Sequence, residues 1–377
     1  MLQDAPLLWL AAVGLLVALV ALVALVALVA LVARVGAARL RGWRRRRRGL
    51  SGLSGPSAGS ASIAAAAAPA THPAAGSGEP ALADRSRLGR YRIERSLGRG
   101  SMGMVYLAHD PPHGRMVAIK TMALSRELDA TDLADARQRF RREADTAARL
   151  RHPDIVAVFE AGEERGLAFI AMEYLPGHDL LRHTLAGRLL PLPVLLRTLA
   201  RVALALAYAH TQGVVHRDVK PANVMIDPDT GTVKVTDFGI ASIADARRTR
   251  TGIVLGTPSY MSPEHLAGRR VDGRSDLYSL GVMLFQLLTG ELPHRGESMA
   301  ELLNQIANEA APDVRSLRPE LPEALADVLT LALDKRPELR YGDGRQMAAD
   351  LTAIADGLDS QPGAENSRHD PRHNAGH

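Results

Sequence analysis

The chain of 377 residues contains no cysteine, few aromatic residues and only four lysines among its 46 basic side chains. The absence of cysteine excludes a disulfide scaffold, a cysteine-ligated zinc site and thiol catalysis. Aromatic side chains make up 4% of the sequence, too few for the stacking platforms that bind single-stranded nucleic acid. The net charge of +5 arises within residues 1–48, which hold eight arginines and one aspartate. We therefore expect no nucleic-acid partner for the rest of the chain.

A long apolar run lies near the amino terminus. Leu7 to Ala33 is 27 residues without a charge and contains the triplet Ala-Leu-Val five times. A helix of this length spans about 40 Å, more than the hydrocarbon core of about 30 Å. The three-residue repeat has no polar face, which excludes an amphipathic surface helix. We predict a transmembrane helix over 7–33. A cleaved signal peptide is the alternative, disfavoured by the length of the run and the lack of a basic segment before it.

Arginine is concentrated directly after the apolar run. The eight arginines lie in residues 34–48, whereas residues 1–6 carry one acidic group. The positive-inside rule therefore places 34–48 in the cytoplasm and 1–6 outside it. This predicts a single-pass protein of the inner (cytoplasmic) membrane. We expect the juxtamembrane arginines to contact anionic lipid, with a nucleic-acid-binding tail as the alternative interpretation.

Two segments have compositions that do not support a packed core. Residues 49–90 are dominated by glycine, serine, alanine and proline, and residues 356–377 are polar and include three histidines. Such segments bury too little apolar surface to offset the entropy of ordering. We predict a flexible linker over 49–90 and a disordered tail over 356–377, with the tail histidines solvated rather than bound to a metal.

A glycine-rich motif follows the first strand-like segment of the remaining region. Residues 91–97 run into Gly98-Arg-Gly100-Ser-Met-Gly103, after which residues 105–108 are strand-like again. A lone Gly-x-Gly-x-x-Gly is weak evidence, and the dinucleotide-binding version should open a helix. A strand–glycine–strand hairpin is instead a flap whose backbone amides can close over phosphates, since glycine has no Cβ to block the approach.

A lysine and a glutamate follow at positions that suit phosphate binding. Lys120 ends the buried-strand pattern of residues 117–120, and Glu143 lies in the helical pattern of residues 130–150. Taken alone, Lys120 would be a solvent-facing strand end and Glu143 a solvated helix residue. Together with the glycine flap they become a candidate phosphate-binding lysine and its carboxylate partner.

Two further motifs place chemistry-bearing side chains close together. Residues 216–223 read His-Arg-Asp-Val-Lys-Pro-Ala-Asn, and residues 237–239 read Asp-Phe-Gly. With the glycine motif and the strand lysine, and in this order, they resemble the signature set of protein kinases. Residues 256–264, Gly-Thr-Pro-Ser-Tyr-Met-Ser-Pro-Glu, are similar to the corresponding stretch of bacterial Hanks-type (eukaryotic-like) serine/threonine kinases.

The resemblance implies an α+β, two-lobed protein kinase fold over residues 91–355. A small β-rich amino-terminal lobe and a larger helical carboxyl-terminal lobe would follow the predicted transmembrane helix. Residues 272–281 are similar to the family's central carboxyl-lobe helix, and Arg340 is similar to the residue that pairs with Glu264. The implied activity is transfer of the γ-phosphate of ATP to serine or threonine hydroxyls of protein substrates.

The resemblance also assigns catalytic roles. Asp218 would orient the substrate hydroxyl and accept its proton, and Lys220 would contact the γ-phosphate, as in serine/threonine kinases. Lys120 would hold the α- and β-phosphates and would itself be held by Glu143. The implied catalytic set is Asp218, Lys220, Lys120, Glu143, Asn223 and Asp237.

The implied cofactors are ATP and Mg²⁺, with Mn²⁺ as an alternative metal. Asn223 and Asp237 would bind the metal through oxygen atoms, which hard cations prefer. Leu97, Val105 and Ala118 would enclose the base. Residues 172–175, Met-Glu-Tyr-Leu, resemble the gatekeeper and hinge, whose backbone would pair with the base. The implied nucleotide-binding set is Leu97, Gly98, Arg99, Gly100, Ser101, Met102, Gly103, Met104, Val105, Ala118, Lys120, Met172, Glu173 and Leu175.

Regulation is expected in the loop between residues 239 and 262. Thr249 and Thr251 resemble autophosphorylation sites, Arg217 could pair with a phosphate there, and Thr257 would lie near Lys220. Phosphorylation between two copies of the chain would require a homodimer, which the sequence leaves open. A catalytically dead scaffold is the main alternative to an active kinase. A small-molecule phosphotransferase of related fold is a weaker one.

Overall fold

The computed structural model describes residues 87–100, 103–123, 130–164, 166–185, 187–238 and 258–360. The predicted transmembrane helix, the arginine-rich segment and residues 1–6 lie outside these ranges, as do most of the predicted linker and tail. The individual candidate residues that also lie outside them are Ser101, Met102, Thr249, Thr251 and Thr257.

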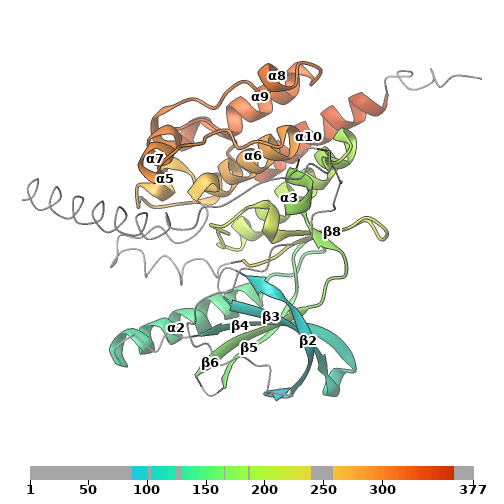
Figure 1. The fold of residues 1–377 in the computed structure, drawn as a ribbon, viewed down its shortest axis with the longest axis vertical. Coiled ribbons are helices and arrows are strands. Elements are labelled where there is room, and N and C mark those ends of the chain that lie inside the picture. Colours follow the sequence, from blue (N-terminus) through green and yellow to red (C-terminus); the bar gives the residue numbers. More distant parts are fainter. Residues whose placement is uncertain are drawn as a thin grey trace, which may run out of the picture. The chain divides into compact units, whose positions relative to one another are not determined.

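The first part of the described region is an antiparallel sheet with one helix packed against it (Figure 1). The strand order is β1-β2-β3-β4-β6-β5. The strands are β1 (Arg87–Leu88), β2 (Tyr91–Gly100), β3 (Gly103–Asp110), β4 (Arg115–Ala123), β5 (Val158–Glu164) and β6 (Leu167–Glu173). Helix α2 (Ala130–Ala147) packs on β5, and its Phe140 and Ala144 are buried there. This is the predicted β-rich lobe.

The strand register separates two faces of this sheet. Val105 on β3 is opposite Lys120 on β4, and Ala118 on β4 is opposite Met172 on β6, with no bulge in either pairing. Opposed residues share a face and alternate residues return to it, so these four side chains lie on one face. The other face packs an apolar cluster around Tyr91. Of the candidate nucleotide-binding residues, Val105, Ala118, Lys120 and Met172 therefore share one surface, whereas Met104 packs against the cluster on the other face.

The second part of the described region is helical and is built around α6 (Gly273–Thr289), of whose 17 residues thirteen are buried. The carboxylate of Asp272 caps its first turn, and Gly290 in the left-handed conformation ends it. This confirms the predicted central helix over 272–281. The other α-helices are α3 (Leu192–Thr211), α5 (Pro263–Leu266), α7 (Met299–Asn308), α8 (Val314–Leu317), α9 (Glu323–Ala332) and α10 (Gly344–Asp359).

A small second sheet carries the segments with the catalytic motifs. It has the order β7-β8-β9, formed by β7 (His178–Asp179), β8 (Val224–Asp227) and β9 (Thr232–Val235). The 3₁₀ helix η4 (Pro221–Asn223) leads into β8, and Asp237 follows β9. A parallel bridge between Ile155 and Val235 joins β9 to the segment before β5. Residues 216–223 and 237 are thus brought to one end of this sheet.

Both ends of the folded domain extend beyond the predicted limits. Residues 87–90, predicted as linker, form β1 and a turn, because Leu88 is fully buried against the first sheet and Gly89 adopts a positive φ of 55°. At the other end, α10 continues to Asp359 through the start of the predicted tail. Leu358 packs against the core there, which explains the extension.

Helix α3 is, within the described residues, the one helix long and apolar enough to cross a membrane. However, 61% of the apolar stretch of this helix is buried inside the domain, where its buried leucines and alanines pack against α6 and α10. Its composition is therefore that of a core helix.

Candidate active site

Three of the predicted catalytic side chains lie together at the start of β8. Lys220 Nζ donates to both carboxylate oxygens of Asp218, at 3.0 and 2.8 Å. Asn223 Nδ2 donates to the Asp218 carboxylate at 3.0 Å and to its backbone carbonyl at 2.8 Å. The side chain of Asp218 is 24% exposed, so a substrate hydroxyl can reach it. Two donors thus orient a solvent-accessible carboxylate, as a general base requires.

A buried aspartate on α6 holds the backbone that presents Asp218. Asp276 is 1% exposed and accepts hydrogen bonds from the backbone N–H groups of His216 and Arg217, both at 2.8 Å, and pairs with His210 at 2.8 Å. Arg217 has a φ of 67°, which non-glycine residues rarely adopt and which costs of order 1–3 kcal/mol. Asp276 therefore stabilises a strained loop. No local sequence pattern indicates this role for Asp276, because its partners lie about 60 positions away.

His216 connects the loop to the segment that carries Asp237. Its Nδ1 accepts from the Asp218 N–H at 3.2 Å, so its Nε2 donates to the Thr236 carbonyl, at 2.9 Å. The imidazole ring also packs on Phe238, with ring centroids 4.6 Å apart. Asp237 has a φ of 65°, a second strained position. Strain concentrated in two residues of one site is typical of functional sites.

Lys120 pairs with Asp237 instead of with Glu143, which corrects the expected pairing. Its ammonium donates to Asp237 Oδ2 at 2.7 Å, and no ion pair between Lys120 and Glu143 occurs within the described part of the chain. Lys120 is only 4% exposed, so its charge needs a nearby carboxylate, and Asp237 provides it. Glu143 is half-buried on α2 and interacts with another group.

The residues predicted to bind metal suit a hard divalent cation. The Asn223 amide nitrogen is used by Asp218, which leaves its oxygen as the ligand atom, and Asp237 adds a carboxylate. The Thr236 N–H donates to the Asn223 carbonyl at 2.9 Å, so the two ligand-bearing segments are joined directly. Carboxylate and amide oxygens are the ligands that Mg²⁺ and Mn²⁺ prefer.

The glycines of the β2–β3 hairpin are needed for different reasons. A Cβ at Gly103, whose φ is 152°, would lie 1.9 Å from the Thr121 carbonyl oxygen, so close packing against β4 requires this glycine. A Cβ at Gly98 would meet nothing within 4 Å. The sequence predicts that all these glycines are needed for the close approach of phosphates. Packing against β4 alone explains Gly103, whereas at Gly98 there is open space for a ligand.

We expect Gly98→Ala and Gly103→Ala to have different effects. Gly98→Ala should leave the melting temperature unchanged and raise KM for ATP, because the new methyl group occupies only the space above the hairpin. Gly103→Ala should lower the melting temperature, because the backbone of β3 must move away from β4. Thermal unfolding and ATP kinetics on both variants test this. Equal destabilisation by the two substitutions would contradict it.

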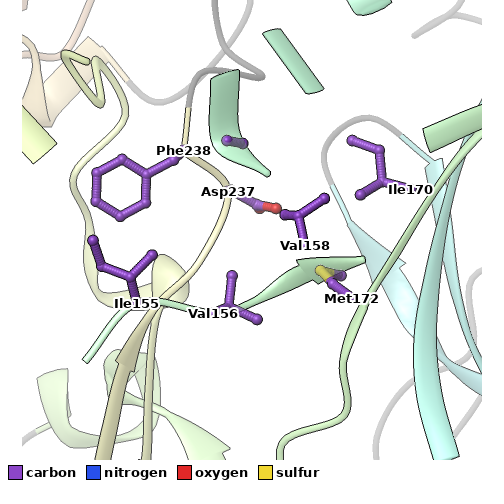
Figure 2. Close-up of a pocket in the computed structure, with 8 residues that line it drawn as sticks. Ile155, Val156, Val158, Ile170, Met172, Asp237 and Phe238 are labelled. Atoms are coloured by element: carbon purple, nitrogen blue, oxygen red, sulfur yellow. The ribbon is translucent and has the colours of Figure 1, made fainter. Parts of the chain in front are cut away.

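A small apolar pocket lies beside the gatekeeper position Met172. Its walls come from α2, β5 and the segment before it, β6, and the segment after β9. Figure 2 shows Asp237 directed towards Val158, while Phe238 lies on the side of Ile155. The predicted base-enclosing residues differ in exposure: Ala118 is 6% exposed, whereas Leu97 is 37% exposed.

The side chain of Glu173, in the predicted hinge, holds neighbouring strands together. Lys234 Nζ donates to Glu173 Oε2 at 2.9 Å, and the Ala157 N–H donates to the same oxygen at 3.2 Å. The Glu173 N–H in turn donates to the Ala157 carbonyl at 2.8 Å. These contacts anchor the hinge to β9, whose end leads to Asp237.

Comparison with known proteins agrees with this geometry. The family model for the protein kinase domain matches residues 91–351, more than half of the chain. The chain belongs to the protein kinase family. Among solved structures, the crystal structure of the Mycobacterium tuberculosis PknI kinase domain has a TM-score of 0.59 at 35% identity, covering 73% of this chain and all of that one. The predicted resemblance is therefore confirmed.

Several similar curated proteins are bacterial serine/threonine kinases. A probable serine/threonine-protein kinase of Streptomyces coelicolor is 42% identical over 277 residues, covering 71% of this chain and 40% of that protein. PrkC of Bacillus subtilis is 38% identical, covering 71% and 41%, and PknJ of M. tuberculosis is 43% identical, covering 68% and 44%. The chain spans less than half the length of these relatives.

The kinase domain also contains the predicted ion pair between Glu264 and Arg340. Arg340 binds both carboxylate oxygens of Glu264, each at 2.8 Å, and both residues are buried. Ser275 on α6 donates a further hydrogen bond to Glu264. Burial would raise the pKa of Glu264, but the hydrogen bonds from Arg340 and Ser275 lower it to about 2. The carboxylate is thus ionised throughout the physiological pH range.

Proposed function

We propose that this protein is an active serine/threonine protein kinase that transfers the γ-phosphate of ATP to protein hydroxyls. The observation that carries the proposal is the set of contacts around Asp218, where Lys220 and Asn223 orient a carboxylate that substrate can reach. The names of the relatives support the serine/threonine class.

Each of these residues has a distinct role in phosphoryl transfer. Asp218 accepts the proton of the substrate hydroxyl and orients it in line with the phosphorus. Lys220 is placed to neutralise charge on the transferred group, and Lys120 to bind the other phosphates. Asn223 and Asp237 would hold Mg²⁺, which supplies further positive charge to the phosphates when bound. Catalysis of this type depends mainly on positioning, and the hydrogen bonds from Asp276 maintain that positioning.

The direct test is transfer of labelled phosphate from ATP to a generic basic protein by the purified full-length chain. We expect phosphoserine or phosphothreonine after acid hydrolysis of the labelled protein. Binding of ATP without any transfer, to protein or to water, would instead favour the scaffold alternative. Labelled phosphotyrosine alone would contradict the serine/threonine assignment.

We further propose that autophosphorylation of Thr249, Thr251 or both activates the kinase. Support comes from Arg217, whose Nε is buried and has no hydrogen-bond partner within the described residues. A phosphothreonine carries about −1.5 to −2 charges and would satisfy such a donor. Mass spectrometry of the ATP-treated protein should find the modification, and an Asp218→Asn protein should lack it. Both threonines unmodified in active protein would refute this proposal.

The amino-terminal segment leads to a proposal on location. We propose that residues 7–33 anchor the kinase in the cytoplasmic membrane, with the arginines of 34–48 on the cytoplasmic side, because the run is long enough and carries no charge. Deletion of residues 7–33 should move the protein from the membrane fraction to the soluble fraction. Recovery of both forms in the same fraction would overturn the proposal.

A further inference from the structure

One lysine of the helical lobe differs from the others in its partners. The chain contains four lysines, and three of them, Lys120, Lys220 and Lys234, are paired with a carboxylate at 2.7–2.9 Å. Lys335, which follows α9, forms no ion pair with a carboxylate among the residues that the structure describes. We propose that Lys335 is a nucleophilic amine that accepts an acyl group from an acyl phosphate. Nothing in the proposed phosphoryl transfer uses this residue.

The groups in contact with the Lys335 ammonium are neutral. Its Nζ donates to the Ile306 carbonyl at 2.9 Å and to Nε2 of His294 at 3.0 Å, and it lies 5.9 Å from the centre of the Tyr278 ring, at the limit of a cation–π contact. An ammonium can only donate, so His294 accepts through Nε2 and carries its proton on Nδ1. Burial and the nearby Lys335 lower the pKa of His294 to about 4, so its ring is neutral at physiological pH.

The surrounding charges favour the neutral form of Lys335. Burial and the guanidinium of Arg340 lower the pKa of Lys335 to about 8, against smaller opposing effects of Glu309 and Asp334. Arg340 stays charged and in place because it is bound to Glu264 at 2.8 Å. A lysine that is desolvated and lies beside a second cation is in the usual setting of a nucleophilic amine. About half of the Lys335 side chains are therefore neutral near pH 8.

The neutral amine keeps both hydrogen bonds and gains a free lone pair. Its two N–H groups suffice for the Ile306 carbonyl and for His294, and the third position on Nζ has no partner within the described residues. The side chain of Lys335 is half-buried, so a small electrophile can reach it. The next residue, Arg336, has a guanidinium that is 68% exposed and can attract the phosphate group of the reagent.

The acyl transfer is balanced without a further reactant. The Nζ lone pair attacks the carbonyl carbon of the acyl phosphate, the bond from that carbon to the phosphate oxygen breaks, and phosphate leaves with the electron pair. The departing phosphate takes one Nζ proton, and the product is an uncharged amide. Because the amide retains a single N–H, acylation removes the hydrogen bond of Lys335 either to Ile306, on α7, or to His294.

The test exposes the full-length chain, purified in detergent and free of nucleotide, to a limiting amount of acetyl phosphate. Peptide mass spectrometry then gives the acetylated fraction of each lysine over time. At pH 8 we expect Lys335 to be acetylated at least about tenfold faster than Lys234, which is also half-buried but is paired with Glu173 at 2.9 Å. The rate at Lys335 should level off above about pH 8, whereas the rate at Lys234 should continue to rise towards pH 10.

Two substitutions of His294 separate the nucleophilicity of Lys335 from its accessibility. His294→Gln keeps a neutral acceptor and should leave the rate at Lys335 within a factor of two. His294→Asp supplies a carboxylate, which raises the pKa of Lys335, and should lower the rate by about tenfold. If His294→Asp unfolds, the pH profile of the parent protein decides. Equal rates at Lys335 and Lys234, equal rates in the two folded variants, or a rate at Lys335 that rises up to pH 10 would show that Lys335 is only a structural donor.

Discussion

Replacement of Asp218 by asparagine should reduce kcat by about 10²–10⁴-fold while ATP still binds. The amide has the same shape and can still accept from Lys220, but it cannot take the substrate proton. Lys120 and Asp237 are unchanged, so nucleotide affinity should change little. Steady-state kinetics with a protein substrate, together with an ATP-binding measurement, give the two quantities.

Asp229→Asn is the matched control for this substitution. Asp229 lies exposed in the turn between β8 and β9, and the same chemical change there should leave kcat within a factor of two. Equal activity of Asp218→Asn and the unmodified protein would remove Asp218 from the mechanism. It would also contradict the proposed kinase activity.

Arg340→Ala should lower the free energy of unfolding by about 3–5 kcal/mol. The substitution leaves the Glu264 carboxylate buried with its charge uncompensated. It also removes the donors that Arg340 directs to the carbonyls of Asp334 and Lys335, at 2.7 and 3.2 Å, and its stacking on Tyr278. Denaturant unfolding measures the loss. Arg336→Ala is the control, because Arg336 is 68% exposed and should change stability by less than about 0.5 kcal/mol.

The effect of Arg340→Ala should depend on pH in a defined direction. The pKa of Glu264 is about 2 in the folded protein, below its ordinary value of 4.5. The ion pair therefore stabilises the folded state fully above pH 4.5, and this contribution to the free energy of unfolding is lost as the pH falls towards 2. The difference between the variant and the unmodified protein should shrink over that interval. A difference independent of pH would assign the loss to packing on Tyr278 rather than to charge.

Much of the candidate site could be predicted from the sequence because its residues lie in short motifs. Asp218, Lys220 and Asn223 are within six positions of one another, and the contacts among them need only a local loop and one turn of 3₁₀ helix. The glycine hairpin likewise follows from local composition, whereas the central helix over 272–281 was predicted through the family resemblance. The pairing of Glu264 with Arg340 was predicted through the family resemblance, not from spacing.

Other contacts were decided by packing between distant segments. Lys120 and Asp237 are 117 positions apart, and no local pattern indicates that Lys120 pairs with Asp237 rather than with Glu143. The register of β3 against β4 explains why Gly103 must be a glycine, and burial of Leu88 explains why the domain begins before residue 91.

The amino-acid sequence by itself determined which chemical groups are present, their order, and the kinase family to which they belong. Only the tertiary structure decided which carboxylate neutralises Lys120, that Asp276 supports the strained backbone at Arg217, and that Lys335 lies against His294. The physical reason is that hydrogen bonds and ion pairs act over a few ångströms. Such distances between remote residues are set by how the helices and sheets pack, which no single stretch of sequence specifies.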